Sequence, residues 1–386
     1  MFFTVSLYAA LTVSAVGLLW KLCSWVRAEA GTGPAGLPIG SRLKTALGGS
    51  LKSVFSGRLA TLIKVLVVDV LLQVRVLRDR EDRLLWLEHF LIFSGFTLLL
   101  LFHALSALIT INLDPDFQPT LNPYLVLRNL FGVAVLAGLV LALIRRGIRP
   151  AEDRLKTKPR DWYALILIAV IILSGFFLEA TKIPSEAVYG QMVEDYSDAT
   201  EPEEAAALKA LWIVEYGLVT GEEVLFDEKT VEAGRELNET SCLACHDRPG
   251  AAFISYPLSR LIKPLAPALD RTGLRTVLYY IHFLACFIGL ALLAWTKMFH
   301  LIATPVSLMV NALTDRESET PAAAANRTLI EQDGCEPCGV CRSGCPVRIN
   351  REERTGQGEQ YGPEGEYALG VDWERLGARP AREREA

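Results

Sequence analysis

The sequence predicts an all-α integral membrane protein, a bundle of five transmembrane helices with an external insert and a cytoplasmic tail. Of its 386 residues, 51% are hydrophobic and 22% are charged, which is too apolar for an ordinary soluble domain. Five apolar stretches have the length needed to cross a bilayer core, roughly 20 helical residues. Basic and acidic residues gather in different loops, and no basic face accompanies the net charge of −5, which excludes a nucleic-acid-binding protein.

We expect the five spans at residues 3–26, 84–109, 124–144, 162–181 and 274–301. The first has its positive charges after the apolar run and no obvious small-residue cleavage site, so we expect a retained helix and not a signal peptide. The stretch 59–77 is also apolar, but Lys64, Asp69 and Arg75 interrupt it. We therefore expect an interfacial helix there and no sixth span.

The loop charges predict the orientation. The connection 145–160 carries seven basic residues against two acidic ones, which places it in the cytoplasm by the positive-inside rule. The loop that contains Asp114 and Asp116 has no base and is expected outside. Five crossings of the cytoplasmic (inner) membrane then leave the N-terminus outside and the C-terminus in the cytoplasm.

Four regions follow along the chain. Residues 1–181 hold the first four helices, with a cytoplasmic interfacial segment at 27–83, and residues 273–310 add the fifth. Between them, the insert 182–272 contains 17 Asp and Glu against 8 Lys and Arg. The tail 311–386 has too few large apolar residues for a core of its own, so we expect it to lie along a partner subunit.

Six of the eight cysteines fall into two tight clusters, as in cofactor sites. In the insert, Cys242-Leu-Ala-Cys245-His246 is the pattern by which haem c is attached, with two thioethers to the vinyl groups and one axial imidazole. A zinc-binding or redox-active Cys-x-x-Cys is the alternative. The external location favours haem c, because this group is attached outside the cytoplasmic membrane. The sixth ligand is Met192, which supplies the insert's one thioether, or another group, or none.

The other four histidines all lie in predicted spans, where an ionisable residue is a functional candidate. On a regular helix, His89 and His103 differ by about 40° and His282 and His300 by nearly 0°, so each pair shares a face. The pairs are about 21 and 27 Å apart along their helices. Because the two helices are antiparallel, His89 meets His300 at the cytoplasmic side and His103 meets His282 outside. This arrangement predicts two bis-histidine haem b sites, and the alternative is four packing histidines.

The tail contains a run of four cysteines followed by Pro346, with the C-x2-C-x2-C-x3-C-P spacing of bacterial [4Fe-4S] ferredoxins: Cys335, Cys338, Cys341 and Cys345. Structural zinc is the alternative. In two-cluster ferredoxins the fourth cysteine of such a run serves the other cluster, so the fourth ligand here is Cys345, which we favour, or Cys23, or a partner's thiolate. Cys286 is expected to be a packing residue.

Charged residues near the spans offer further candidates. Lys297 and Arg128 would neutralise haem propionates or contact a quinone carbonyl, or else extend to the membrane interface. Glu88 and Glu179 would relay protons or simply be solvated.

The histidine-containing runs resemble a known family. His89-Phe-Leu-Ile-Phe-Ser-Gly-Phe96, Ile281-His282 and the run from Thr296 through His300 to Pro305 resemble the dihaem cytochrome b of respiratory nitrate reductase gamma subunits and heterodisulfide-reductase-type membrane complexes. The resemblance covers residues 1–181 and 274–310. It implies that the four histidines hold two haems b and that a quinone binds beside one of them. The insert and the tail depart from the compact nitrate-reductase subunits, so the quinone position is not transferred.

Together these features predict a membrane electron-transfer subunit of a respiratory redox complex. Its cofactors would be two haems b, one covalent haem c, one [4Fe-4S] cluster and a quinone, either menaquinone or ubiquinone. Its partners would be membrane lipid, a cytoplasmic iron-sulfur or flavin redox subunit in a hetero-oligomer, and an external cytochrome c. The catalytic site for the other substrate is expected on another chain, because this one has no nucleotide-binding fingerprint. A non-redox membrane anchor is the alternative, and a transporter is disfavoured by the lack of inverted repeats.

Overall fold

The computed structural model describes residues 1–28, 36–55, 57–78, 83–148, 159–197, 199, 201–222, 227–315 and 318–334. All regular secondary structure in these ranges is helical. The chain divides into two compact units, and each is described by itself. The first comprises Met1–Ser6, Leu87–Glu152 and Trp162–Gly289, and the second comprises Leu7–Trp86, Asp153–Asp161 and Leu290–Ala386.

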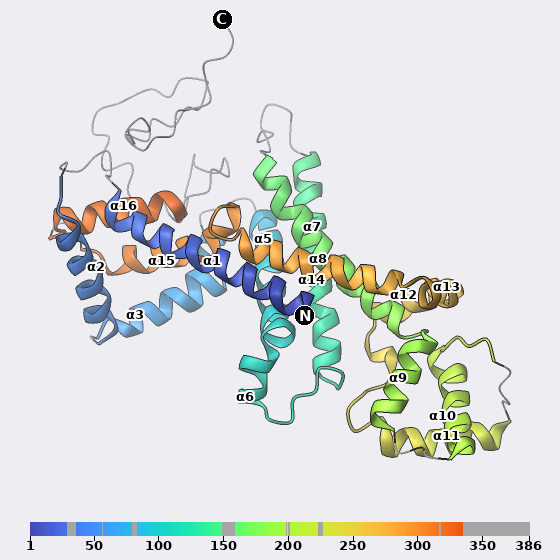
Figure 1. Cartoon of the computed structure of the whole chain (residues 1–386). Helices are drawn as coiled ribbons and strands as arrows, with labels where there is room; N and C mark the ends of the chain where they lie inside the picture. Colours follow the sequence, from blue (N-terminus) through green and yellow to red (C-terminus); the bar gives the residue numbers. More distant parts are fainter. Residues whose placement is uncertain are drawn as a thin grey trace, which may run out of the picture. The chain divides into compact units, whose positions relative to one another are not determined.

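The first unit contains four long apolar helices and the helices of the insert (Figure 1). The long helices are α5 (Arg83–Leu99, most of it in this unit), α7 (Tyr124–Ile148), α8 (Pro159–Lys182) and α14 (Leu274–Ala291). Helix α6 (Ile111–Leu113) is a single turn. The insert forms α9 (Glu186–Tyr196), α10 (Pro202–Leu211), α11 (Glu228–Ser241), α12 (Ser255–Ile262) and α13 (Ala266–Thr272).

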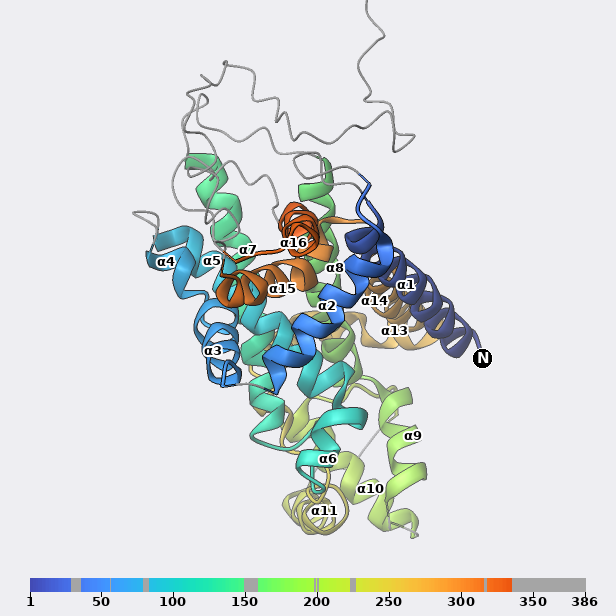
Figure 2. The same ribbon diagram turned by 90° about the vertical axis from the view of Figure 1, so that its left-hand side faces the viewer.

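The second unit contains most of α1 (Phe2–Arg27), then α2 (Ile39–Val54), α3 (Leu59–Lys64), α4 (Val74–Arg78), α15 (His300–Leu313) and α16 (Pro321–Gly334). Helices α15 and α16 lie side by side (Figure 2). Its core is formed by Trp25 of α1, Phe299, Ala303 of α15 and Ile330 of α16.

Five helices are long and apolar enough to cross a membrane, as the sequence predicted: Phe2–Arg27, Arg83–Ala104, Tyr124–Gly147, Trp162–Lys182 and Leu274–Ala291. The stretch 59–77 is not among them. It is divided into α3, a π-helical segment (Val65–Leu71) and α4, and Gln73 between them has a positive φ of 53°. The chain is therefore a multi-pass membrane protein.

The fifth span differs from the expectation of one helix over 274–301. Helix α14 ends at Ala291, and a new helix begins only at His300. Thr296 causes the restart, because its extended backbone and its hydroxyl, which accepts from Met298 N, cap the following turn. Across the break, the Trp295 ring lies so close to Gly17 of α1 that a Cβ there would overlap it. His282 and His300 thus lie on different helices, so the prediction that they share one helical face is wrong.

The second span is also less regular than expected. After Leu99 the helix widens into a π-helical segment, Leu100–Ala104, closed by the bond from Leu105 N to Leu100 O at 2.8 Å. A π-helical turn advances by less than 100° per residue. His103 lies in this segment, so the 40° offset from His89 calculated for a regular helix does not hold.

Glycines let α5 and α7 approach closely. A Cβ at Gly95 would be 2.8 Å from the Phe131 carbonyl oxygen, and one at Gly138 would be 2.8 Å from the Glu88 carbonyl oxygen. Small residues at such contacts are common in membrane helix pairs, where packing replaces the hydrophobic effect as the driving force. The contact holds α5, and with it His89 and His103, against its neighbour.

The insert closes on itself at its base. Asp270 of α13 accepts hydrogen bonds from the Ser185 hydroxyl at 2.6 Å and from Ala187 N at 3.2 Å, and it pairs with Arg275 of α14 at 2.7 Å. Ser185 is also the N-cap of α9, accepting from Val188 N. The entry of the insert from α8 and its exit into α14 therefore meet at one polar cluster.

The first part of the predicted tail packs against its own chain. Asp333 of α16 accepts from Lys21 Nζ and Trp25 Nε1 of α1, both at 2.7 Å, and Thr304 of α15 donates to the Gly334 carbonyl oxygen at 2.9 Å. The remaining tail, 335–386, lies outside the described residues.

Candidate functional site

His103 and His282 face each other in the first unit. Their ring centroids are 6.4 Å apart and the rings are tilted by 47°. His103 lies in the π-helical segment after α5, and His282 lies on α14. The structure thus brings together the pair that the sequence predicted for the external side.

Neighbouring groups of α8 orient the His282 ring. Its Nδ1 is 3.1 Å from the Ile171 carbonyl oxygen and 3.0 Å from the Ser174 hydroxyl. A carbonyl oxygen only accepts, so Nδ1 carries the proton and donates to Ile171, which leaves the Nε2 lone pair available to a metal. Gly175 adds a steric requirement, because a Cβ there would be 3.2 Å from His282 Cε1.

The spacing of the two rings fits a bis-histidine haem. Two imidazoles that bind one metal from opposite sides, each at about 2.0–2.1 Å, have ring centroids roughly 6–6.5 Å apart. The observed 6.4 Å lies in this range. The fixed tautomer of His282 is also the one that a haem ligand requires.

A polar network lies beside the pair. The ionisable neighbours of His103 are Arg128, Glu179 and Lys182, besides His282. Arg128 is paired with Glu179, and their side chains are 20% and 23% exposed, so both are partly buried. Asn129, which is 1% exposed, donates to Glu179, and its Oδ1 accepts from Ile254 N at 3.1 Å and Ser255 N at 3.4 Å. The network ties α7 and α8 to the start of α12.

The other two histidines lie in different units, and their pairing stays a prediction. His89 lies on α5 in the first unit. The preceding residue, Glu88, is 6% exposed and forms a two-point ion pair with Arg145 of α7, so it is buried and not solvated. His300 begins α15 in the second unit, and its Nδ1 hydrogen-bonds to the carbonyl oxygen of Lys297. As at His282, this bond orients the ring through Nδ1.

The Cys242–His246 segment forms one helical turn at the end of α11. Cys245 N and His246 N both donate to the Cys242 carbonyl oxygen, at 3.2 and 2.9 Å. Residues three and four apart on a turn share a face, so both thiols and the imidazole belong to the same side. Both cysteines are free thiols, Cys242 buried and Cys245 exposed. This arrangement fits attachment of a haem across the two sulfurs.

The two ends of this turn contact different parts of the first unit. At one end, the Thr120 hydroxyl donates to the Cys245 carbonyl oxygen, and Asp247 N donates to the Thr120 carbonyl oxygen at 2.9 Å. At the other end, Cys242 N donates to the carbonyl oxygen of Asn238 at 3.0 Å. Burial raises the pKa of the Cys242 thiol and lowers the pKa of His246, which favours the neutral imidazole that binds metals.

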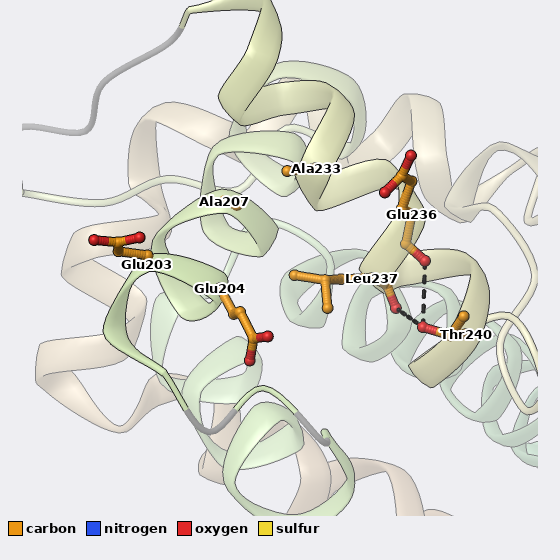
Figure 3. A pocket seen from close by; sticks show the side chains of 7 residues that line it. All are labelled: Glu203, Glu204, Ala207, Ala233, Glu236, Leu237 and Thr240. Atoms are coloured by element: carbon orange, nitrogen blue, oxygen red, sulfur yellow. Dashed lines mark hydrogen bonds between the residues drawn. The ribbon is translucent and has the colours of Figure 1, made fainter.

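Met192, the candidate sixth ligand, is half-buried on α9. No group of three or more His, Cys, Asp or Glu residues within the described ranges is arranged to hold a metal ion. A shallow hollow between α10 and α11 contains none of the predicted site residues (Figure 3). It carries Glu203 and Glu204 from α10 and Glu236 from α11, and it is a solvated acidic face.

Cys335, Cys338, Cys341 and Cys345 lie outside the described residues, so the predicted iron-sulfur site is untested. Cys23, an alternative fourth ligand, is an exposed free thiol on α1. Lys21 and Trp25 both donate hydrogen bonds to Asp333. Cys23 is two residues from each of them and therefore lies about 160–200° around the helix from their side chains. Cys23 thus belongs to the face of α1 opposite the end of α16. Cys286 is a partly buried free thiol on α14.

Sequence reasoning missed several residues that surround these positions. Ser174 and Gly175 are ordinary residues of an apolar span, and only the packing of α14 reveals their contact with His282. Lys182 resembles any base at a helix end, although it is three residues from Glu179 and therefore on the same face of α8. Lys297, an expected propionate or quinone contact, is seen to contribute its carbonyl oxygen to His300.

Comparison with known proteins gives two relatives. The chain is 29% identical over 146 residues to the E subunit of the dihydromethanophenazine:CoB–CoM heterodisulfide reductase of Methanosarcina acetivorans, a match covering 36% of this chain and 54% of that protein. It is 27% identical over 128 residues to the corresponding protein of Methanosarcina barkeri, covering 32% and 48%. The chain therefore spans about half the length of the curated relatives that it matches. No family model and no solved structure matches. Together with the five apolar helices, these relatives support a membrane subunit of an oxidoreductase complex.

Proposed function

We propose that this chain is the membrane electron-transfer subunit of a respiratory complex. It connects a quinone or quinol in the membrane, a haem c outside, two haems b within the bilayer and a cytoplasmic [4Fe-4S] cluster to a partner catalytic subunit. The N-terminus is outside and the C-terminus is in the cytoplasm. When bound, the haems and the cluster would each carry one electron and the quinone would exchange two electrons with two protons, while the residues of this chain would hold and orient these groups.

The observation that carries the proposal is the His103–His282 pair. Two imidazoles from different helices lie at the spacing of axial ligands, and the Ile171 carbonyl oxygen fixes the tautomer of one of them. A packing histidine needs neither feature. Lys182 adds a positive charge near His103 that would balance haem propionates. Arg128 contributes less, because it is already paired with Glu179.

The relatives favour a redox role over a purely structural one. Their name gives dihydromethanophenazine as the electron donor and the CoB–CoM heterodisulfide as the electron acceptor. We assign a quinol to the corresponding donor role here, and the second substrate to another chain in a hetero-oligomer. The external cytochrome c and the flavin or iron-sulfur partner belong to the same proposal.

The iron-sulfur assignment rests on the cysteine spacing, with Cys345 as fourth ligand. The orientation of Cys23 supports this choice, because Cys23 lies on the face of α1 away from Asp333 and Gly334, the residues that lead into the cysteine run. Cys341→Ser should abolish the EPR signal of the reduced cluster. An unaltered signal in Cys345→Ser would make the self-contained cluster wrong.

The decisive experiment is a pyridine haemochrome spectrum with iron and acid-labile sulfide analysis on the complex purified from a host with haem c maturation. We expect two haems b and one haem c per chain, and a denaturing gel stained for haem should label this chain. The label should vanish in Cys245→Ala. A preparation without a b-type α-band would instead identify a non-redox membrane anchor and refute the proposal.

A further inference from the structure

Tyr189 on α9 carries a buried polar atom that no group within the described ranges satisfies. Its side chain is 7% exposed, and its hydroxyl makes no hydrogen bond to any residue of the described ranges. Buried tyrosine hydroxyls normally have a partner, because an unmade hydrogen bond costs free energy. The position therefore points to a partner from outside the polypeptide or to a group that moves when a ligand is present.

The residues around Tyr189 are fully engaged with one another. The Tyr189 ring lies 5.4 Å from Trp212, whose Nε1 donates to Asn238 Oδ1 at 3.2 Å. Trp212 lies 5.1 Å from Tyr216, whose hydroxyl accepts from Asn238 Nδ2 at 3.1 Å. The Asn238 side chain thus hydrogen-bonds to the indole N–H of Trp212 and to the hydroxyl of Tyr216, but not to the hydroxyl of Tyr189.

This aromatic cluster, formed by Tyr189, Trp212 and Tyr216, lies near the Cys242 end of the helical turn Cys242–His246. Asn238 precedes Cys242 by one helical turn and accepts its backbone N–H. The Cys242 thiol is close enough to raise the pKa of Tyr189, after the larger effect of burial, and it also acts on Tyr216. Through Asn238, the aromatic cluster therefore lies next to the turn that carries Cys242, where a haem edge would be attached.

Helix α9 presents a second residue on the same side. Met192 follows Tyr189 by three residues, so the two side chains share a face of the helix. Met192 is half-buried, whereas Tyr196, near the end of the same helix, is 75% exposed. One face of α9 thus carries both the thioether and the hydroxyl, and Tyr189 on this face packs on Trp212, whose indole N–H bonds to Asn238 one turn before Cys242.

We propose that α9 forms the distal side of the haem c site, where Met192 supplies the sixth ligand and the Tyr189 hydroxyl donates a hydrogen bond to its sulfur. This inference rests on the proposed attachment of haem c at Cys242 and Cys245. A thioether sulfur is a weak acceptor, and a donor to it withdraws electron density from the iron ligand. Tyr189 is therefore a positioning residue that tunes the haem without touching the iron.

The test compares three variants of the full chain, matured in a host that attaches haem c. Met192→Leu should remove the Met–iron charge-transfer band of the ferric haem and let the ferrous haem bind carbon monoxide. Tyr189→Phe should keep the covalent haem and the band but lower the haem c midpoint potential, so that the ferric fraction rises several-fold at a fixed ambient potential. Tyr196→Phe, the exposed tyrosine of the same helix, should match the wild type.

A Tyr189→Phe chain with the wild-type haem c potential would overturn the role of Tyr189, and an intact band in Met192→Leu would overturn the distal position of α9. Both results require a chain that stains for haem. A wild-type chain without covalent haem would refute the haem c assignment itself, at a step before any potential is measured. The two failures are therefore distinguishable.

Discussion

The rings of His103 and His282 lie 6.4 Å apart, although one residue belongs to a π-helical segment after α5 and the other to α14. The two positions are 179 residues apart in the sequence. This contact is the strongest structural support for cofactor binding in this chain, because it brings two imidazole rings to the distance expected for two ligands of one metal. Substitutions at this pair and around it therefore test the haem b assignment directly.

Replacing His282 by Ala should remove one of the two low-spin haems b and leave the other. His103→Ala should give the same spectrum, because both variants break the same pair. The measurement is low-temperature EPR of the oxidised complex together with the haemochrome content. Retention of both haems in either variant would refute the pairing.

Gly175→Val should disturb the same haem without removing a ligand. Even a Cβ would lie 3.2 Å from His282 Cε1, so the larger side chain must push the ring away from its bond to Ile171. We expect an altered EPR signal for one haem b and up to roughly tenfold weaker haem retention, as for other disturbed contacts that orient a metal ligand. Gly190→Ala on α9, where a Cβ meets nothing within 4 Å, is the control.

Asn129→Ala should loosen the connection between α7 and the insert. It removes the acceptor of Ile254 N and Ser255 N and one donor to Glu179, and unsatisfied buried groups cost about 1–3 kcal/mol each. Limited proteolysis of the purified complex should then cut near residue 254 at lower protease concentrations. Asn112→Ala, whose amide donates only to Leu108 within its own turn, should show the wild-type pattern.

Acid should open the base of the insert through Asp270. Burial alone would raise the pKa of Asp270, but hydrogen bonds from Ser185 and Ala187 and the charge of Arg275 outweigh it and lower the pKa below its ordinary value of 3.8. A carboxylate with a lowered pKa stabilises the fold above the ordinary pKa, and this contribution is lost as the pH falls through the lowered one. The insert should therefore be protected at neutral pH and exchange faster near its base in strong acid.

Hydrogen–deuterium exchange of residues 183–190 at several pH values measures this effect. In Asp270→Asn the segment should already exchange faster at neutral pH, with a smaller further increase in acid. An acid response of the same size in Asp270→Asn and in the wild type would assign the effect to other groups.

Cys23→Ser should leave the iron-sulfur EPR signal unaltered, because Cys23 lies on the face of α1 opposite Lys21 and Trp25, which hold Asp333. Loss of the signal in this variant would show that α1 supplies the fourth ligand. The matched control is Cys286→Ser, which changes a thiol on α14 that has no expected role in the cluster.

The sequence by itself determined the five apolar helices, the insert and the candidate ligands, because span length, loop charge and cysteine spacing are local properties. Its extrapolation along the fifth span failed, since the capping of Thr296 and the packing of Trp295 on Gly17 interrupt a helix that hydropathy alone reads as continuous. Only the tertiary structure decided that His103 faces His282 and that Ile171 and Ser174 orient the His282 ring. It also decided that Glu88 pairs with Arg145 and that Glu179 pairs with Arg128. Each of these depends on which helix faces lie against each other, and that follows from the packing of side chains far apart in the chain.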